Sequence, residues 1–219
     1  MNEIDAKSMI LQRRILGFLS ISLSPVCFLF GLIGSNTNPQ YWYKSISLTF
    51  YSNSNIFMIG ILTATAIYFF SYKGYDWKDR LCSLIQAIAC VGIVVFPCSC
   101  KFYDRDTVGL FCLNMNISNI LHSIFAALLF LSFAFNLIFL FTLSSGEKTE
   151  KKKIRNLIYR ISGLIIFICT IAMCFKNYVI KIGIVPEWFP YVLTLEFIAL
   201  TVFGFSYIVK SETIKYFND

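Results

Sequence analysis

The chain has 219 residues, of which 57% are hydrophobic and 14% are charged, and its mean hydropathy is +0.69. Soluble domains carry about 25% charged residues, so this composition excludes an ordinary water-soluble fold and indicates a protein that lies in lipid. The formal net charge of +7 is concentrated between the apolar runs. That placement favours a membrane surface and argues against nucleic acid as a partner.

Six apolar segments are predicted to be transmembrane helices, because crossing the hydrocarbon core takes roughly 17 to 25 apolar residues. They cover about residues 14–34, 56–72, 81–97, 117–143, 157–175 and 188–210. The predicted fold is an all-α, polytopic integral membrane bundle, formed as a single domain over residues 1–219. Arg13 and Arg14 precede an apolar run that is too long for a signal-peptide core, so we expect that run to be retained as a helix.

The basic residues predict the orientation of the bundle. All but five of the 19 Lys and Arg residues fall on one predicted side of the six segments. The five on the other side are Lys44, Lys101, Arg105, Lys176 and Lys181. Because basic residues accumulate in cytoplasmic loops, both the N- and C-termini are predicted to be cytoplasmic, which six crossings allow.

The first predicted outer loop, residues 35–55, is long, polar and aromatic. From Ser45 to Tyr51 its hydroxyl-bearing residues alternate with apolar ones, a period-two pattern that predicts an extended segment. Such a strip, presenting Ser45, Ser47 and Tyr51 over a helical bundle, is suited to forming a lid or a pocket wall. An ordered loop that only satisfies its own backbone is the alternative.

The second predicted outer loop contains three of the eight cysteines: Cys98, Cys100 and Cys112. In an oxidising compartment, a disulfide from Cys112 to either of the other two is expected to staple this loop. A metal site is not expected, because three thiols with no nearby histidine leave tetrahedral zinc one ligand short.

Two ionisable residues lie inside predicted helices: His122, the only histidine, and Glu196. At 1.5 Å per residue they lie roughly 8 and 12 Å below the predicted outer ends of their helices. A charge at such a depth is costly, so both are expected to face the protein interior or a wet cavity, where they can meet. A structural role for Glu196, as a buried acid bonded to a hydroxyl, is the alternative.

A basic cluster leads into the fifth predicted helix and is expected to contact anionic lipid headgroups at ~1 kcal/mol per charge. Its members are Lys151, Lys152, Lys153, Arg155 and Arg160. Membrane topology alone also demands some of this charge, so a purely topological role stays open.

The sequence contains no nucleophile elbow, phosphate-binding loop or dinucleotide fingerprint. One histidine cannot build a multi-histidine metal centre, so neither a metal nor another cofactor is expected. A non-enzymatic function is therefore favoured, with an enzyme kept as an alternative.

Several short motifs are distributed along nearly the whole chain. They are Trp42-x-x-Ser45-Ile46-Ser47, Phe70-Ser71-Tyr72-Lys73-Gly74-Tyr75-Asp76, His122-Ser123 with Ala126, Arg155-Asn156 with Tyr159-Arg160, and Glu196 with Phe203-Gly204-x-Ser206. With these motifs the chain resembles a group of bacterial six-helix membrane proteins, and its layout is distantly similar to the DRAM-like superfamily. The resemblance implies a role at membranes, in lipid organisation or membrane stress, and names no reaction.

The leading hypothesis is a non-enzymatic protein that binds a lipid headgroup or small polar ligand in an outward-facing pocket within the membrane. The pocket is expected among the helices at 56–72, 117–143 and 188–210, capped by the first outer loop. Its predicted ligand-binding residues are Ser45, Ser47, Tyr51, His122 and Glu196. The alternative is a proton-coupled transporter or an oligomeric pore, including a membrane-disrupting effector of bacterial defence.

The expected partners are membrane lipids, and homo-oligomerisation is left open. The expected location is the bacterial cytoplasmic membrane.

Overall fold

The computed structural model describes residues 3–33, 42–143 and 149–217. Six long helices dominate it: α1 (Glu3–Leu32), α2 (Asn55–Ser71), α3 (Trp77–Val95), α4 (Met115–Phe135), α5 (Glu150–Cys174) and α7 (Tyr191–Lys210). The α4 helix continues through one π-helical turn, η3 (Asn136–Leu140). The all-α prediction is confirmed, with one small exception: β1 (Thr107–Val108) and β2 (Leu113–Asn114) form a two-stranded antiparallel hairpin.

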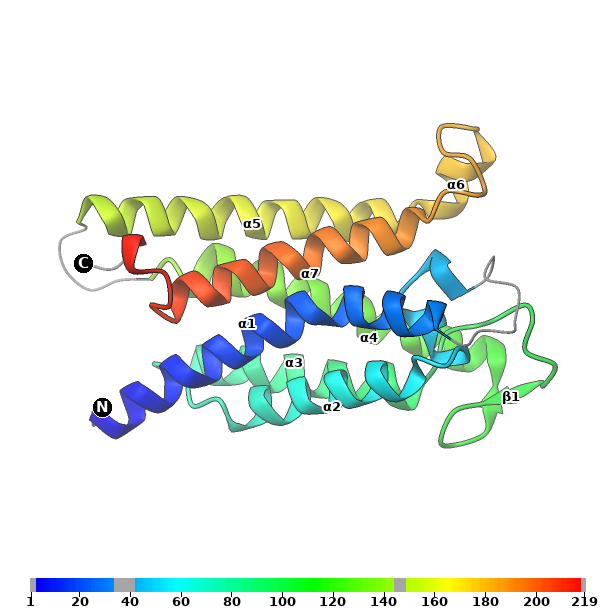
Figure 1. Cartoon of the computed structure of the whole chain (residues 1–219), viewed down its shortest axis with the longest axis horizontal. Coiled ribbons are helices and arrows are strands. Elements are labelled where there is room, and N and C mark those ends of the chain that lie inside the picture. Colours follow the sequence, from blue (N-terminus) through cyan, green and yellow to red (C-terminus); the bar gives the residue numbers. More distant parts are fainter. Residues whose placement is uncertain (1–2, 34–41, 144–148, 218–219) are drawn as a thin grey trace.

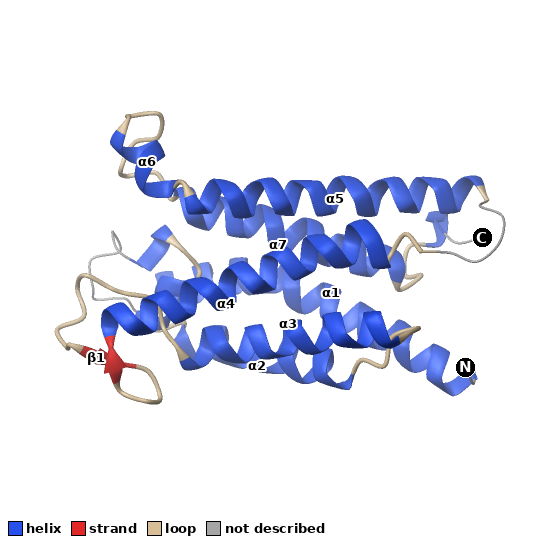
Figure 2. Cartoon of the chain, turned by 180° about the vertical axis from the view of Figure 1, so that it is seen from behind, coloured by secondary structure: helices blue, strands red, loops and turns tan. Residues whose placement is uncertain are grey.

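The six long helices form a closed ring. Each of them packs against the next along the chain, and α7 completes the ring by packing against α1. Figure 1 shows the start of α1 and the end of α7 at one end of the bundle. Figure 2 shows β1 and the short helix α6 (Lys176–Lys181) together at the opposite end. We call these the inner and outer ends.

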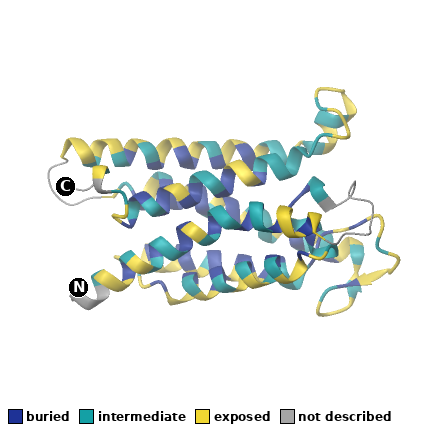
Figure 3. Cartoon of the chain, viewed as in Figure 1, coloured by how far each residue is buried: buried dark blue, intermediate teal, exposed yellow. Residues whose placement is uncertain are grey.

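The surface of this ring is suited to lipid. Among the described residues, four helices are long and apolar enough to cross a membrane: Ala6–Leu32, Met115–Leu140, Glu150–Cys174 and Tyr191–Lys210. The α2 helix is apolar but shorter. Large apolar side chains are exposed along the outward faces of the helices, among them Phe18, Ile67, Phe70, Ile88, Ile124 and Leu164 (Figure 3). Polar side chains such as Gln86 are buried between the helices. In water such a continuous apolar surface would drive aggregation, whereas in hydrocarbon it costs little.

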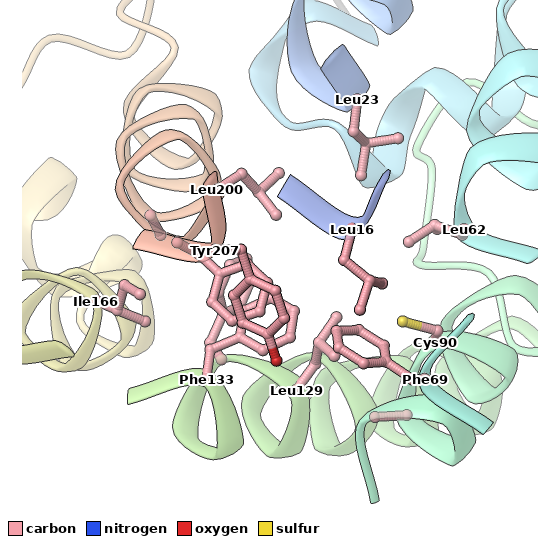
Figure 4. Close-up of a cluster of buried hydrophobic side chains, with 14 of the residues drawn as sticks. Leu16, Leu23, Leu62, Phe69, Cys90, Leu129, Phe133, Ile166, Leu200 and Tyr207 are labelled. Atoms are coloured by element: carbon pink, nitrogen blue, oxygen red, sulfur yellow. The ribbon is translucent and has the colours of Figure 1, made fainter. Parts of the chain in front are cut away.

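The core contains a cluster of aromatic side chains from three helices of the ring. Phe133 of α4 stacks on Phe203 of α7, with ring centroids 3.6 Å apart. Phe69 of α2 and Tyr207 of α7 pack around this pair (Figure 4). This cluster separates the outer half of the interior from the inner half.

The contact between α1 and α7 depends on two glycines. A Cβ atom on Gly17 would lie 2.8 Å from the backbone oxygen of Gly204, and one on Gly204 would lie 2.5 Å from the oxygen of Gly17. Backbone atoms cannot rotate out of the way, so only glycine lets the two helices approach this closely. The crossing helps to set the position of α7, the helix that carries Glu196.

Three helices begin four or more residues earlier than the sequence predicts, and local capping explains two of these differences. The α3 helix begins at Trp77 because Asp76 caps it, with its Oδ1 accepting from the Asp79 amide at 2.9 Å. The α5 helix begins at Glu150 because the Thr149 hydroxyl oxygen accepts from the Lys152 amide at 3.2 Å. A capping side chain satisfies an amide that has no helical partner, and so extends the helix into polar sequence. The first helix extends back to Glu3.

Much of the basic segment predicted to be a loop is therefore helical. Parts of two predicted loops, residues 35–41 and 144–148, lie outside the described residues.

Candidate functional site

The segment from Ser45 to Tyr51 is not extended, so that prediction is wrong. It forms a 3₁₀ turn, η2 (Ser47–Tyr51). Its hydroxyl groups bond within the turn: Ser45 Oγ accepts from the Leu48 amide at 3.2 Å, and Thr49 Oγ1 donates to the Ile46 carbonyl at 2.5 Å. Serine and threonine side chains compete in this way with extended pairing, which overrides the period-two pattern.

Glu196 lies inside the bundle, on the face of α7 that packs beneath this turn. Its side chain is only 8% exposed. The carboxylate oxygen Oε2 accepts a hydrogen bond of 2.6 Å from the backbone amide of Ile46, which is itself buried. The acid therefore faces the protein interior, as predicted, and holds the first outer loop through its backbone.

His122 lies on α4 and is 5% exposed. Its Nδ1 atom lies 2.8 Å from the carbonyl oxygen of Phe96, and its Nε2 atom lies 2.8 Å from Ser47 Oγ. A carbonyl can only accept, so Nδ1 carries the hydrogen, and in the neutral ring Nε2 accepts from the Ser47 hydroxyl. The histidine therefore links α4 to the end of α3 and to the loop.

Glu196 and His122 meet the same turn rather than each other. No hydrogen bond or ion pair joins them within the part of the chain that the structure describes. Their partners, Ile46 and Ser47, are consecutive in sequence. Two helices thus hold one loop, one through a main-chain amide and the other through a side-chain hydroxyl.

A cavity of about 470 Å³ lies beside this arrangement at the outer end. Four of the five predicted ligand-binding residues line it: Ser45, Ser47, His122 and Glu196. The rest of the lining includes Lys176 and apolar side chains of α4, α5 and α7. We call it the outer cavity.

The outer cavity differs in two details from the pocket that the sequence predicts. The helical walls of the outer cavity belong to α4, α5 and α7, whereas α2 lines a smaller neighbouring space of about 50 Å³, which Glu196 and Ser47 also border. Tyr51 does not line the outer cavity, because its hydroxyl donates to the Cys98 carbonyl and so fastens the first outer loop to the second. Burial raises the pKa of Tyr51, which keeps the hydroxyl protonated as a donor.

The three outer-loop cysteines are free thiols in the structure, so the conditional disulfide is not formed there. Cys98 and Cys100 are buried, whereas Cys112 is exposed. Burial raises the pKa of the Cys98 thiol to about 12. Within the described residues, no group of three or more His, Cys, Asp or Glu side chains could hold a metal ion.

The five predicted lipid-contacting basic residues divide between two environments. Lys152 and Arg155 line a cavity at the inner end, whereas Lys151, Lys153 and Arg160 are exposed. Lys153 forms an ion pair of 2.7 Å with Glu150. Contact between these residues and lipid stays a prediction.

Sequence reasoning missed Lys176 and the cavity at the inner end that Lys152 and Arg155 line. Lys176 directly follows a predicted helix, and only the folded chain brings it beside Glu196. The sequence does contain a pattern that indicates this cavity. Its lining residues Lys152, Asn156 and Tyr159 recur at helical spacing on one face of α5.

Comparison with protein-family models, with curated proteins and with solved structures found no match for this chain. The fold and the site therefore rest on the chain's own residues. They define an all-α protein with membrane-type helices and a polar cavity between them.

Proposed function

We propose that the chain is an integral membrane protein that crosses the bilayer six times, with both termini in the cytoplasm. The helices α2 and α3 have 17 and 19 residues. At 1.5 Å per residue they span roughly 25 and 28 Å, close to the thickness of a hydrocarbon core. The ring of six helices and the predominance of basic residues at the inner end support this topology. The proposed location is the bacterial cytoplasmic membrane, as the sequence resemblance implies.

The proposed function is non-enzymatic binding of a lipid headgroup or a small polar ligand in the outer cavity. The observation that carries this proposal is the combination of polar and apolar groups in one space. Ser45, Ser47, His122 and Glu196 lie together, and apolar side chains from α4, α5 and α7 form the remaining walls. A volume of about 470 Å³ is within the range of ligand pockets, and this lining suits an amphipathic molecule.

The polar groups indicate how such a ligand is held. The Ile46 amide occupies Oε2 of Glu196, which leaves Oε1 to accept from a ligand hydroxyl or ammonium group. Lys176 supplies a cation on the same cavity wall. A headgroup with both a donor and an anionic group matches this pair, because each charge then has a partner away from water.

The test is native mass spectrometry of the protein released from neutral detergent after incubation with a membrane lipid extract. Glu196→Gln keeps an acceptor for the Ile46 amide but removes the charge, so retained lipid is expected to fall about tenfold. Glu187→Gln is the matched control, because Glu187 is exposed and does not line the outer cavity. Equal lipid retention by the wild type and Glu196→Gln would overturn the proposal.

Proton-coupled transport is a second candidate, because Glu196 borders both the outer cavity and the smaller space beneath it. A carboxyl group between two spaces can pass a proton from one to the other. The aromatic cluster around Phe133 and Phe203 closes the path farther in, so transport requires that cluster to move. A pH-sensitive dye in proteoliposomes under an imposed proton gradient tests this candidate. Dye responses equal to those of protein-free vesicles would remove it.

A further inference from the structure

A second large cavity, of about 580 Å³, lies at the inner end of the bundle. Its lining comes from the first turns of α5, the end of α7, the segment after η3 and the turn between α2 and α3. Figure 1 shows the start of α5 and the end of α7 at this same end. The aromatic core separates it from Glu196 and the outer cavity. We call it the inner cavity.

One ammonium group is held in the wall of this cavity. Lys210 Nζ donates to the Phe141 carbonyl at 3.0 Å. Three aromatic rings surround the same atom, at 5.9 Å for Tyr75, 5.2 Å for Phe141 and 5.6 Å for Tyr159. The Phe141 carbonyl takes only one of the N–H donors of Lys210, so the remaining donors are available to a ligand.

The facing wall is one side of α5, where Lys152, Arg155, Asn156 and Tyr159 line the cavity. Asn156 is 8% exposed and Tyr159 is 1% exposed. The Nδ2 atom of Asn156 and the hydroxyl of Tyr159 are buried and have no hydrogen-bond partner among the described residues. Buried donors are nearly always satisfied in folded proteins, so two unsatisfied ones beside two cations indicate a missing acceptor.

Two of the three carboxylates that line the inner cavity accept hydrogen bonds within the turn that carries them. Asp76 Oδ1 accepts from the Asp79 amide, and Asp79 Oδ2 accepts from the Tyr75 amide at 3.0 Å. Glu212, the third acid in the lining, is exposed. Arg13 adds a further cation close by, with its guanidinium 4.9 Å from the centroid of the Tyr75 ring. Donors and cations therefore predominate on the α5 and α7 walls.

We infer that the inner cavity binds a phosphate group, held by Lys152, Arg155 and Lys210 and by the two unsatisfied donors of Asn156 and Tyr159. Phosphate offers several strong acceptor oxygens and a charge that complements clustered cations. In the proposed topology the cavity lies where headgroups meet the cytoplasm, so the phosphate belongs either to a phospholipid headgroup or to a soluble phosphate ester. This inference involves neither Glu196 nor the outer cavity, and it can fail while the proposed function stands.

The test measures binding of two probes to the full-length protein in neutral detergent. Phosphatidylglycerol is titrated by native mass spectrometry, and glycerol 3-phosphate is titrated by isothermal calorimetry. Lys152→Gln and Tyr159→Phe are each expected to weaken binding about tenfold. Tyr159→Phe removes a hydroxyl that has no partner in the described part of the chain, so stability should not fall. A loss of binding in this variant then reports the lost contact with phosphate. Lys78→Gln is the matched control, because Lys78 is an exposed basic residue in the first turn of α3 at the inner end and does not line the cavity.

Binding of phosphatidylglycerol alone would identify a lipid headgroup as the source, and binding of glycerol 3-phosphate would identify a soluble ester. The inference is overturned if neither probe binds, or if either Lys152→Gln or Tyr159→Phe leaves the affinity unchanged. It is also overturned if Lys78→Gln weakens binding as much as Lys152→Gln does, because general surface charge then explains the effect.

Discussion

Glu196 has a structural task that can be separated from ligand binding. Its carboxylate accepts the hydrogen bond of the Ile46 amide, and both residues are buried. Glu196→Ala removes the acceptor and leaves that amide without a partner. Glu196→Gln retains an acceptor oxygen of nearly the same reach and removes only the charge. The two substitutions therefore separate the hydrogen bond from the electrostatics of the site.

The expected magnitude follows from the burial of this amide. A buried donor that loses its acceptor costs about 1–3 kcal/mol. Because this cost falls on the closed state of the loop, opening becomes easier by the same amount. The exchange rate of the Ile46 amide hydrogen with solvent should then rise roughly 5- to 150-fold in Glu196→Ala. In Glu196→Gln we expect the exchange rate to rise less than about threefold. The amide oxygen of Gln still accepts the Ile46 hydrogen bond, which is weakened only because a neutral acceptor replaces a charged one.

Hydrogen–deuterium exchange in detergent, followed by mass spectrometry of peptides covering the first outer loop, measures these rates. Glu187→Ala serves as the control, because it removes an exposed outer carboxylate that does not contact Ile46. Exchange at Ile46 that is unchanged in Glu196→Ala would refute the reasoning, since the loop would then be held without the acid.

Two further predictions concern packing and thiol chemistry. Gly17→Ala should be about 1–3 kcal/mol less stable than Gly60→Ala in detergent unfolding, because its Cβ would meet the Gly204 oxygen whereas a Cβ on Gly60 meets nothing within 4 Å. Equal stability would show that α1 and α7 can separate freely. With its pKa raised from 9.0 to about 12, the Cys98 thiol should alkylate roughly 50-fold more slowly than an ordinary thiol at neutral pH. Peptide mapping after iodoacetamide treatment should show Cys112 labelled first, and simultaneous labelling would contradict the buried position of Cys98.

Several features of this protein could be predicted from local sequence. The apolar runs located the long helices, and α2 and α7 end within a residue of the predicted positions. The cost of a charge in hydrocarbon correctly placed Glu196 and His122 in the interior. Arguments of this kind succeed because hydropathy and burial act on each segment almost independently of its neighbours.

The errors arose where side chains bond to nearby backbone. The hydroxyl groups of Ser45 and Thr49 fold the first outer loop into a 3₁₀ turn, although its alternating pattern predicted an extended segment. Asp76 and Thr149 extend two helices into charged sequence that hydropathy assigned to loops. Such bonds depend on single side-chain geometries, which a periodicity of apolar residues does not report.

The amino-acid sequence by itself determined that this protein is helical, that its surface suits lipid, and that the ionisable groups within its apolar helices must face the protein interior. Only the tertiary structure decided which groups meet. It brought Glu196 and His122 to consecutive residues of one loop, and it placed Lys210 opposite the α5 face that carries Asn156 and Tyr159. The physical reason is that hydrophobicity selects the segments that become helices, whereas close packing, as between Gly17 and Gly204, sets how those helices lie against one another.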